Sequence, residues 1–229
     1  ILEGRSSLGG ATNLPFVRDL SPLDIATMPS VFQLLPHENT LRAFDENLQP
    51  MKIDIYDIET WRKYNWAVFN QNEDYLREFS TAERGRFEEY FSITLSRAKK
   101  FHEALRAKTR TKISLDFYAV GSSCGETLDG LILYKNREKW VTLTRPDSFR
   151  TSNGTKVSRE VVKRLIIVPG DEKVTIRSLL AETTAKAGSK GLSSVLPIKS
   201  KSFVCERHDS LMGNVQILGD VFEGLALKE

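Results

Sequence analysis

Residues 165–174 read Leu-Ile-Ile-Val-Pro-Gly-Asp-Glu-Lys-Val, and this stretch gives the strongest indication of the fold. Its apolar opening predicts the end of a buried strand, Val161–Val168, and Pro169-Gly170 predicts that the strand stops sharply. Asp171 then lies at the C-terminal end of the strand. A helical pattern follows over Val174–Thr184. A strand, an acid and a helix in this order are typical of an α/β chain.

The same arrangement recurs around His208. A predicted strand, Lys201–Cys205, precedes this histidine, and an apolar stripe predicts a helix from Asp209 onward. An acid and then a histidine, each at a strand end, are the last two members of a serine hydrolase triad. In such a triad a buried carboxylate fixes the tautomer of the imidazole that moves the serine proton. Asp171 and His208 are therefore candidate catalytic residues. The alternative, a helix cap and a loop histidine, stays open from the residues alone.

The N-terminal half reads as a lid and a cap. Residues 1–57 are interrupted by glycine and proline too often for long elements, and they predict an irregular lid on a larger body. Residues 58–110 have helical patterns, and Ser-Thr-Ala-Glu at 80–83 predicts a capping box before the longer helix. His102, on this helix, is interpreted as a packing or surface histidine. The helix carries an apolar stripe at spacings of three and four residues: Phe87, Phe91, Leu95, Ala98, Phe101 and Leu105.

The C-terminal half, residues 111–229, is predicted to form the core that carries the acid and the histidine. Strands are expected at Ile113–Val120, Gly130–Tyr134 and Trp140–Leu143, separated by turn-forming residues. The strand–helix–strand–helix order that ends the chain indicates a sheet that is at least partly parallel.

Composition is that of an ordinary globular protein, with 40% hydrophobic and 28% charged residues. The net charge is only +3, and basic residues alternate with acids. The one dense basic run, residues 106–112, is interpreted as a solvated junction, so no nucleic-acid partner is predicted. No apolar stretch approaches the roughly 18 residues of a transmembrane helix, so no transmembrane segment is predicted.

The two cysteines, Cys124 and Cys205, indicate neither a metal motif nor a disulfide framework. Two free thiols fit a reducing compartment, and the first residues lack the pattern of a signal peptide. Both points favour a cytoplasmic location. Because the chain opens with Ile-Leu-Glu-Gly-Arg rather than Met, we expect it to begin within a longer protein.

Four segments, in order, are similar to motifs of the lecithin–cholesterol acyltransferase family of α/β-hydrolases. Residues 28–36 resemble its Pro-Ser-x-x-x-Leu-Leu-Pro segment. Residues 117–121 with Thr127 resemble its Tyr-Gly-x-Gly-x-x-Thr strand and turn. Residues 170–174 with Ser178 resemble its Gly-Asp-Gly-Thr-Val acid motif and the serine that follows. Residues 208–214 resemble the histidine segment that opens the last helix. Glu172-Lys173 departs from the family's Gly-Thr.

The resemblance implies the C-terminal part of an α/β-hydrolase-like sheet with an inserted helical cap. It implies a serine esterase, lipase or O-acyltransferase acting on lipid or other esters, in which Asp171 orients His208 as general base and then general acid. The nucleophile is expected upstream of Ile1, in a missing N-terminal half of the core, so this chain alone should be inactive. No metal or organic cofactor is implied. The alternative is a non-catalytic α/β module that binds a partner or apolar ligand and has a degenerate triad.

One segment imitates the missing nucleophile motif. Residues 121–125, Gly-Ser-Ser-Cys-Gly, fit Gly-x-Ser-x-Gly, and Ser123, Asp171 and His208 occur in the hydrolase order. A nucleophile elbow joins a strand to a helix, however, whereas residues 126–134 read as a turn and a strand. The sequence therefore predicts a strand-to-strand turn at Ser123.

Overall fold

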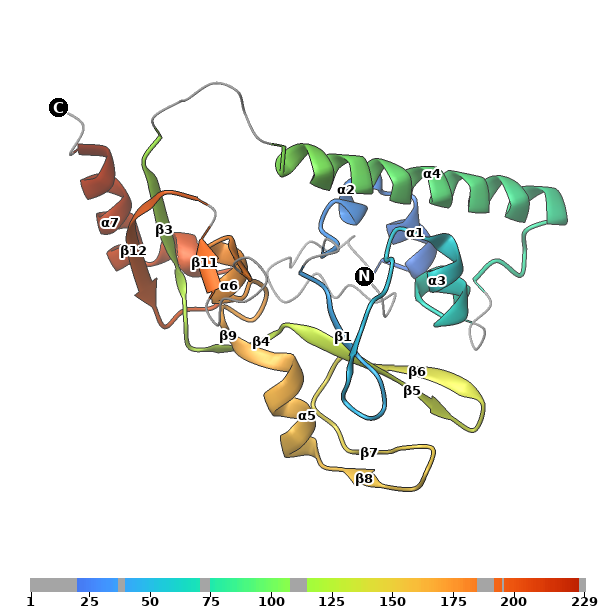
Figure 1. The fold of residues 1–229 in the computed structure, drawn as a ribbon. Coiled ribbons are helices and arrows are strands. Elements are labelled where there is room, and N and C mark those ends of the chain that lie inside the picture. Colours follow the sequence, from blue (N-terminus) through green and yellow to red (C-terminus); the bar gives the residue numbers. More distant parts are fainter. Residues whose placement is uncertain are drawn as a thin grey trace. The chain divides into compact units, whose positions relative to one another are not determined.

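The protein is represented by a computed structural model that mixes helices and strands along the chain (Figure 1). Residues 1–19 of the predicted lid, 108–112 of the basic run and 113–114 of a predicted strand lie outside the residues that the structure describes. Those described are residues 20–36, 40–70, 75–107, 115–184, 192–194 and 196–226.

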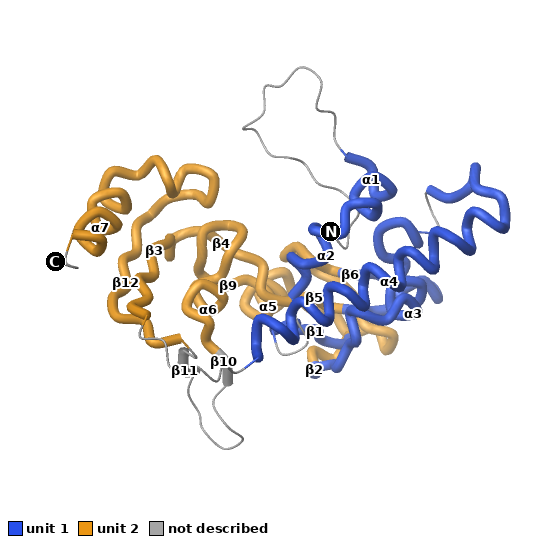
Figure 2. The backbone as a smooth tube through the Cα atoms, turned by 90° about the horizontal axis from the view of Figure 1, so that it is seen from above, with its two compact units in different colours: residues 1–45, 49–109, 133–142 blue, residues 46–48, 110–132, 143–229 orange. Residues whose placement is uncertain are grey.

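The chain forms two compact units (Figure 2). Unit 1 comprises residues 1–45, 49–109 and 133–142. Unit 2 comprises residues 46–48, 110–132 and 143–229, and it contains both candidate catalytic residues.

Unit 1 is organised by the long helix α4 (Thr81–Leu105). The predicted capping box is confirmed, because the Ser80 hydroxyl accepts the Glu83 N–H while the Glu83 carboxylate accepts the Ser80 N–H. The stripe is buried over its first four members and exposed at its last two, Phe101 (38%) and Leu105 (68%).

Aromatic side chains fill the core of unit 1. Phe91 of α4 meets Phe32, which ends the short helix α2 (Pro29–Phe32), with ring centroids 5.1 Å apart. It also meets Trp61 of α3 (Ile58–Lys63) at 5.2 Å. Trp61 is fully buried, and its indole N–H donates to the Ile55 carbonyl at 2.8 Å. The other short helices here are α1 (Pro22–Ala26) and the 3₁₀ helix η1 (Ala67–Phe69).

A four-stranded sheet has the order β2 (Pro50–Met51), β1 (Arg42–Phe44), β5 (Gly130–Asn136) and β6 (Lys139–Leu143). The strands β5 and β6 confirm the predictions at Gly130–Tyr134 and Trp140–Leu143. Buried and exposed side chains do not alternate regularly along β5, because Leu131, Ile132 and Leu133 are all buried.

Unit 2 contains short two-stranded pairings. The strand β3 (Phe117–Ser122) lies parallel to β12 (Ile198–Val204), as expected for a partly parallel sheet. The strand β4 (Gly125–Leu128) lies antiparallel to β9 (Ile167–Gly170). Two more antiparallel pairs are β7 (Phe149–Arg150) with β8 (Lys156–Val157), and β10 (Glu182–Thr184) with β11 (Leu192–Ser194).

The predicted strand Val161–Val168 is wrong in its first part, which forms the helix α5 (Arg159–Ile166). The Ser158 hydroxyl accepts the Val161 N–H and caps this helix. Val162 and Ile166, four residues apart, are fully buried, so the packing has helical periodicity. Only β9 remains extended.

The predicted helix Val174–Thr184 is shorter in the structure. It is reduced to α6 (Ile176–Leu179), whose first turn is capped by the Thr175 hydroxyl. The chain leaves the helix at Ala181, which adopts a left-handed φ of 48° before β10 begins.

The last helix, α7 (Val215–Ala226), begins later than Asp209, because the 3₁₀ helix η2 (Leu211–Gly213) precedes it. It packs through Ile217 against Val204 and Leu211. No described helix is long and apolar enough to cross a bilayer.

Candidate acid–histidine site

Asp171 directly follows β9, and Gly170 makes the turn possible. A Cβ at Gly170 would lie 2.3 Å from the Val174 carbonyl oxygen and 2.4 Å from the Thr127 hydroxyl oxygen, so only glycine fits. Asp171 Oδ1 then accepts two backbone hydrogen bonds, from Val174 N at 2.6 Å and from Lys173 N at 2.9 Å. Oδ1 of Asp171 therefore stabilises the turn in which Asp171 itself lies.

The other carboxylate oxygen faces His208, which follows β12. His208 Nδ1 lies 2.8 Å from Asp171 Oδ2, and the His208 N–H donates to the Asp171 carbonyl at 3.0 Å. Because a carboxylate only accepts, Nδ1 carries the proton and Nε2 is left as the basic nitrogen. No hydrogen bond to Nε2 occurs among the described residues.

Burial differs sharply between the two partners. The Asp171 side chain is 7% exposed, whereas that of His208 is 52% exposed. Burial by itself raises the pKa of Asp171. The hydrogen bonds from the His208 ring and from the Val174 and Lys173 N–H groups, together with the charge of the ring, outweigh burial and hold this pKa below its ordinary value of 3.8. Asp171 is therefore ionised at neutral pH, with its proton-bearing partner reaching solvent.

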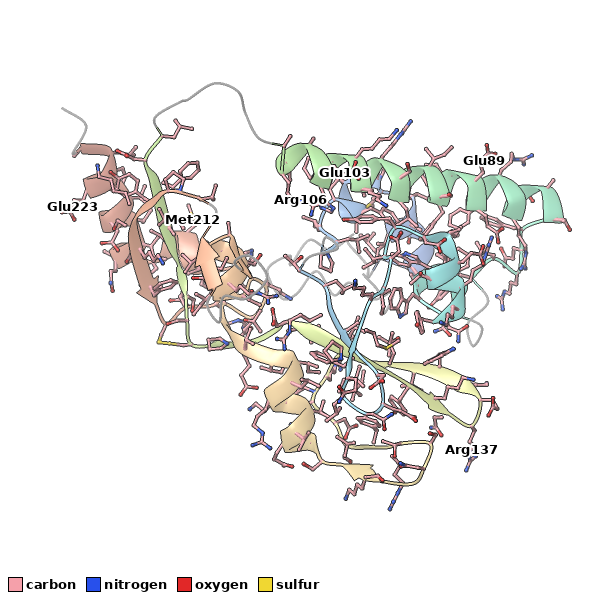
Figure 3. All side chains as sticks on the ribbon, viewed as in Figure 1. Glu89, Glu103, Arg106, Arg137, Met212 and Glu223 are labelled. Carbon is pink, nitrogen blue, oxygen red and sulfur yellow. A yellow bond between two sulfur atoms is a disulfide. The ribbon has the colours of Figure 1, made fainter. Side chains whose placement is uncertain are left out.

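A disulfide joins Cys124 to Cys205, with Cα atoms 5.2 Å apart (Figure 3). The prediction of two free thiols is wrong, so the cysteines no longer support a reducing compartment. The parallel register of β3 with β12 sets Ser122 opposite Val204, which brings the residues just beyond each strand together. The disulfide fastens the loop before His208 to the turn between β3 and β4.

Ser123 lies in that turn and not on an elbow. The strand β3 ends at Ser122 and β4 begins at Gly125, so the predicted strand-to-strand turn is confirmed. The Ser123 N–H donates to the Val204 carbonyl at 3.3 Å. No hydrogen bond between the Ser123 hydroxyl and His208 occurs in the described part of the chain.

The contacts of three residues around the pair, Thr127, Glu172 and Arg207, were not anticipated from the sequence. Glu172 adopts a left-handed φ of 76°, at the position where the resembling motif has glycine. Its carboxylate lies 3.3 Å from Arg207 Nε. Its N–H donates to the Thr127 hydroxyl oxygen at 2.9 Å. Thr127 was already one of the residues that carried the resemblance, and this was the only available signal for it.

A cavity of about 280 Å³ lies on unit 2 beside this turn, but neither Asp171 nor His208 lines it. Its walls come from residues 123–124 of the β3–β4 turn, residues 125–126 of β4, Lys163 and Arg164 of α5, and residues 167–169 of β9. Lys163 pairs with Glu126 at its rim. This cavity is therefore formed by neither the acid nor the histidine of the pair, and by no residue of the predicted lid or cap.

No family model, curated protein or solved structure matches this chain. Within the described residues, no group of three or more His, Cys, Asp or Glu side chains is arranged to hold a metal ion.

Proposed function

We propose that this chain supplies the acid and the general base of a serine hydrolase or O-acyltransferase that acts on carboxylic esters, including lipid esters. The observation that carries the proposal is the 2.8 Å contact between His208 Nδ1 and a buried, ionised Asp171. This contact leaves Nε2 as the ring nitrogen that is free to accept the proton of a nucleophile, and the His208 side chain is 52% exposed.

In this proposal Asp171 keeps the Nδ1 proton in place and stabilises the imidazolium that forms during the reaction. Nε2 of His208 takes the proton of the attacking serine. It then returns that proton to the leaving alkoxide, and the acyl group passes to water or an alcohol. Both side chains follow strands, which supports the rigid placement that proton transfer demands.

The nucleophile is proposed to come from outside these 229 residues, in the N-terminal half of an α/β-hydrolase-like core. The turn geometry at Ser123 supports this assignment. The parallel pairing of β3 and β12 supports the view that residues 111–229 form the C-terminal part of such a sheet. Residues 1–57 and 58–110 are proposed as its lid and helical cap, which would supply the acyl-chain site.

A non-catalytic binding module is the second candidate. Glu172 and Arg207 form an ion pair directly beside the acid and the histidine, and Lys173 adds a third charge. Such charged bulk would crowd an ester, and it favours a degenerate site that only binds a partner or apolar ligand.

The first experiment uses the 229-residue chain and short-chain esters. We expect no turnover above background and no labelling by a fluorophosphonate, because loss of the nucleophile from a serine protease costs on the order of 10⁶ in kcat. Turnover that disappears in Ser123→Ala would overturn the external nucleophile.

The second experiment uses the natural protein in the longer form that this proposal expects. The fluorophosphonate should label it, and His208→Gln should abolish labelling while the protein stays folded. Absence of labelling in a folded natural protein would reject the enzyme and favour the binding module.

A further inference from the structure

Thr127 connects β4 to the turn that carries the acid. It lies opposite Val168 in the β4–β9 pairing and is 1% exposed. Its hydroxyl oxygen accepts the Glu172 N–H at 2.9 Å. Gly170 has no side chain, and this leaves space for the Thr127 hydroxyl oxygen. A Cβ at Gly170 would lie 2.4 Å from that oxygen. The neighbouring strand thus contributes one side-chain atom to the acid turn.

The turn needs such an anchor because of Glu172. A left-handed φ of 76° is disfavoured for glutamate by about 1 kcal/mol. With Glu172 in this conformation, the two N–H groups that follow, from Lys173 and Val174, both reach Asp171 Oδ1. With Oδ1 occupied, Oδ2 is the oxygen that meets His208.

We propose that Thr127 is a positioning residue, whose hydroxyl oxygen holds the Glu172 peptide in the left-handed turn and so aims Asp171 Oδ2 at His208 Nδ1. The catalytic value of this positioning rests on the proposed function. The positioning itself concerns only the tautomer of His208, which can be measured without turnover.

The test compares Thr127→Val, which keeps the shape and removes the acceptor, with Thr127→Ser, which keeps the oxygen. Proton–nitrogen NMR at about pH 9, above the ordinary imidazole pKa, reports the ratio of the Nδ1–H to the Nε2–H tautomer of His208. In Thr127→Val we expect this ratio to fall about tenfold, and Thr127→Ser should restore it.

Thr151→Val is the matched control in the same unit. Thr151 is also a buried threonine, and its hydroxyl oxygen accepts a backbone N–H, from Thr155 at 3.0 Å. We expect this variant to lose comparable stability and to keep the His208 tautomer ratio of the wild type.

An unchanged tautomer ratio in Thr127→Val would overturn the positioning role. If Thr127→Val does not fold, the double variant Thr127→Val/Glu172→Gly removes the left-handed strain. The proposal then expects a folded protein with a recovered ratio, and continued unfolding contradicts it. A wild type that lacks the Nδ1–H tautomer would instead count against the proposed function.

Discussion

The two units hold their central residues by different physical means. In unit 1, large aromatic rings such as Phe32, Trp61 and Phe91 are buried against one another, and burial has no preferred direction. In unit 2, Asp171 and His208 are held by directional hydrogen bonds, helped by a disulfide and by one glycine. Substitutions in unit 1 should therefore mainly lower stability. In unit 2, removal of a single atom near Asp171 and His208 should change the geometry of the pair.

The largest effect is expected for Phe91→Ala. This side chain is fully buried and contacts four other rings, so its removal should lower the free energy of unfolding of unit 1 by about 4 kcal/mol. All three tryptophans lie in unit 1, so urea denaturation followed by tryptophan fluorescence measures it. Phe101→Ala on the same helix is the control, with a smaller loss because Phe101 is 38% exposed. Equal losses in the two variants would contradict the account of the core.

The next effect is that of the disulfide in unit 2. It closes a loop of 81 residues, so removing it should destabilise unit 2 by about 3 kcal/mol. Amide exchange in unit 2 should speed up in a Cys124→Ala/Cys205→Ala variant, and reduction of the wild type by a dithiol should match it. If the exchange rates of the variant and the wild type agree, the disulfide has no part in fixing the site.

The difference between the units also explains what the sequence could reveal. For α4, the capping box and the apolar stripe are local signals, and both predict the helix correctly. The strand predicted at Val161–Val168 was wrong over residues 161–166. The β-branched residues there favour a strand, but the Ser158 cap and the burial of Val162 and Ile166 stabilise a helix.

The last helix shows a subtler limit. Its existence was predicted, but three of its apolar residues, Val215, Phe222 and Leu225, are 82%, 67% and 66% exposed. The residue that packs is Ile217, which is 1% exposed. Periodicity identifies an apolar face, whereas the neighbouring elements decide which face is covered.

Within the site, the proximity of Asp171 and His208 followed from two strand ends in one α/β unit. The disulfide and the Thr127 contact did not follow, because they depend on strand register across sequence separations of 81 and 45 residues. Register is set by tertiary pairing, and a single sequence does not display it.

A smaller effect, about 2 kcal/mol at neutral pH, is expected for Asp171→Asn, because a hydrogen bond to a charged group is lost. The pKa of Asp171 is lowered in the folded protein, so its contribution is complete above its unfolded pKa, near 3.8, and is lost as pH falls through the lower folded value. The stability difference between wild type and variant should therefore shrink below about pH 4.

Denaturation of both proteins at a series of pH values measures this difference, with amide exchange in unit 2 as the signal. Asp116→Asn is a suitable control, because its ion pair with Lys199 is exposed and should contribute little. If the stability difference between wild type and Asp171→Asn stays constant as the pH is lowered, the charge of Asp171 does not stabilise the turn.

The smallest effect is expected at Glu172, and it goes the other way. Glu172→Gly removes the left-handed strain at φ 76° and should stabilise unit 2 by about 1 kcal/mol. It also removes the ion pair with Arg207, but both side chains are substantially exposed, so that loss is small. Glu172→Ala is the matched control, since it removes the same ion pair and keeps a side chain at the strained φ. Denaturation should therefore show that Glu172→Gly is more stable than Glu172→Ala. If the Glu172→Ala and Glu172→Gly variants are equally stable, the turn carries no strain, and Thr127 would not be needed to keep Glu172 in its left-handed conformation.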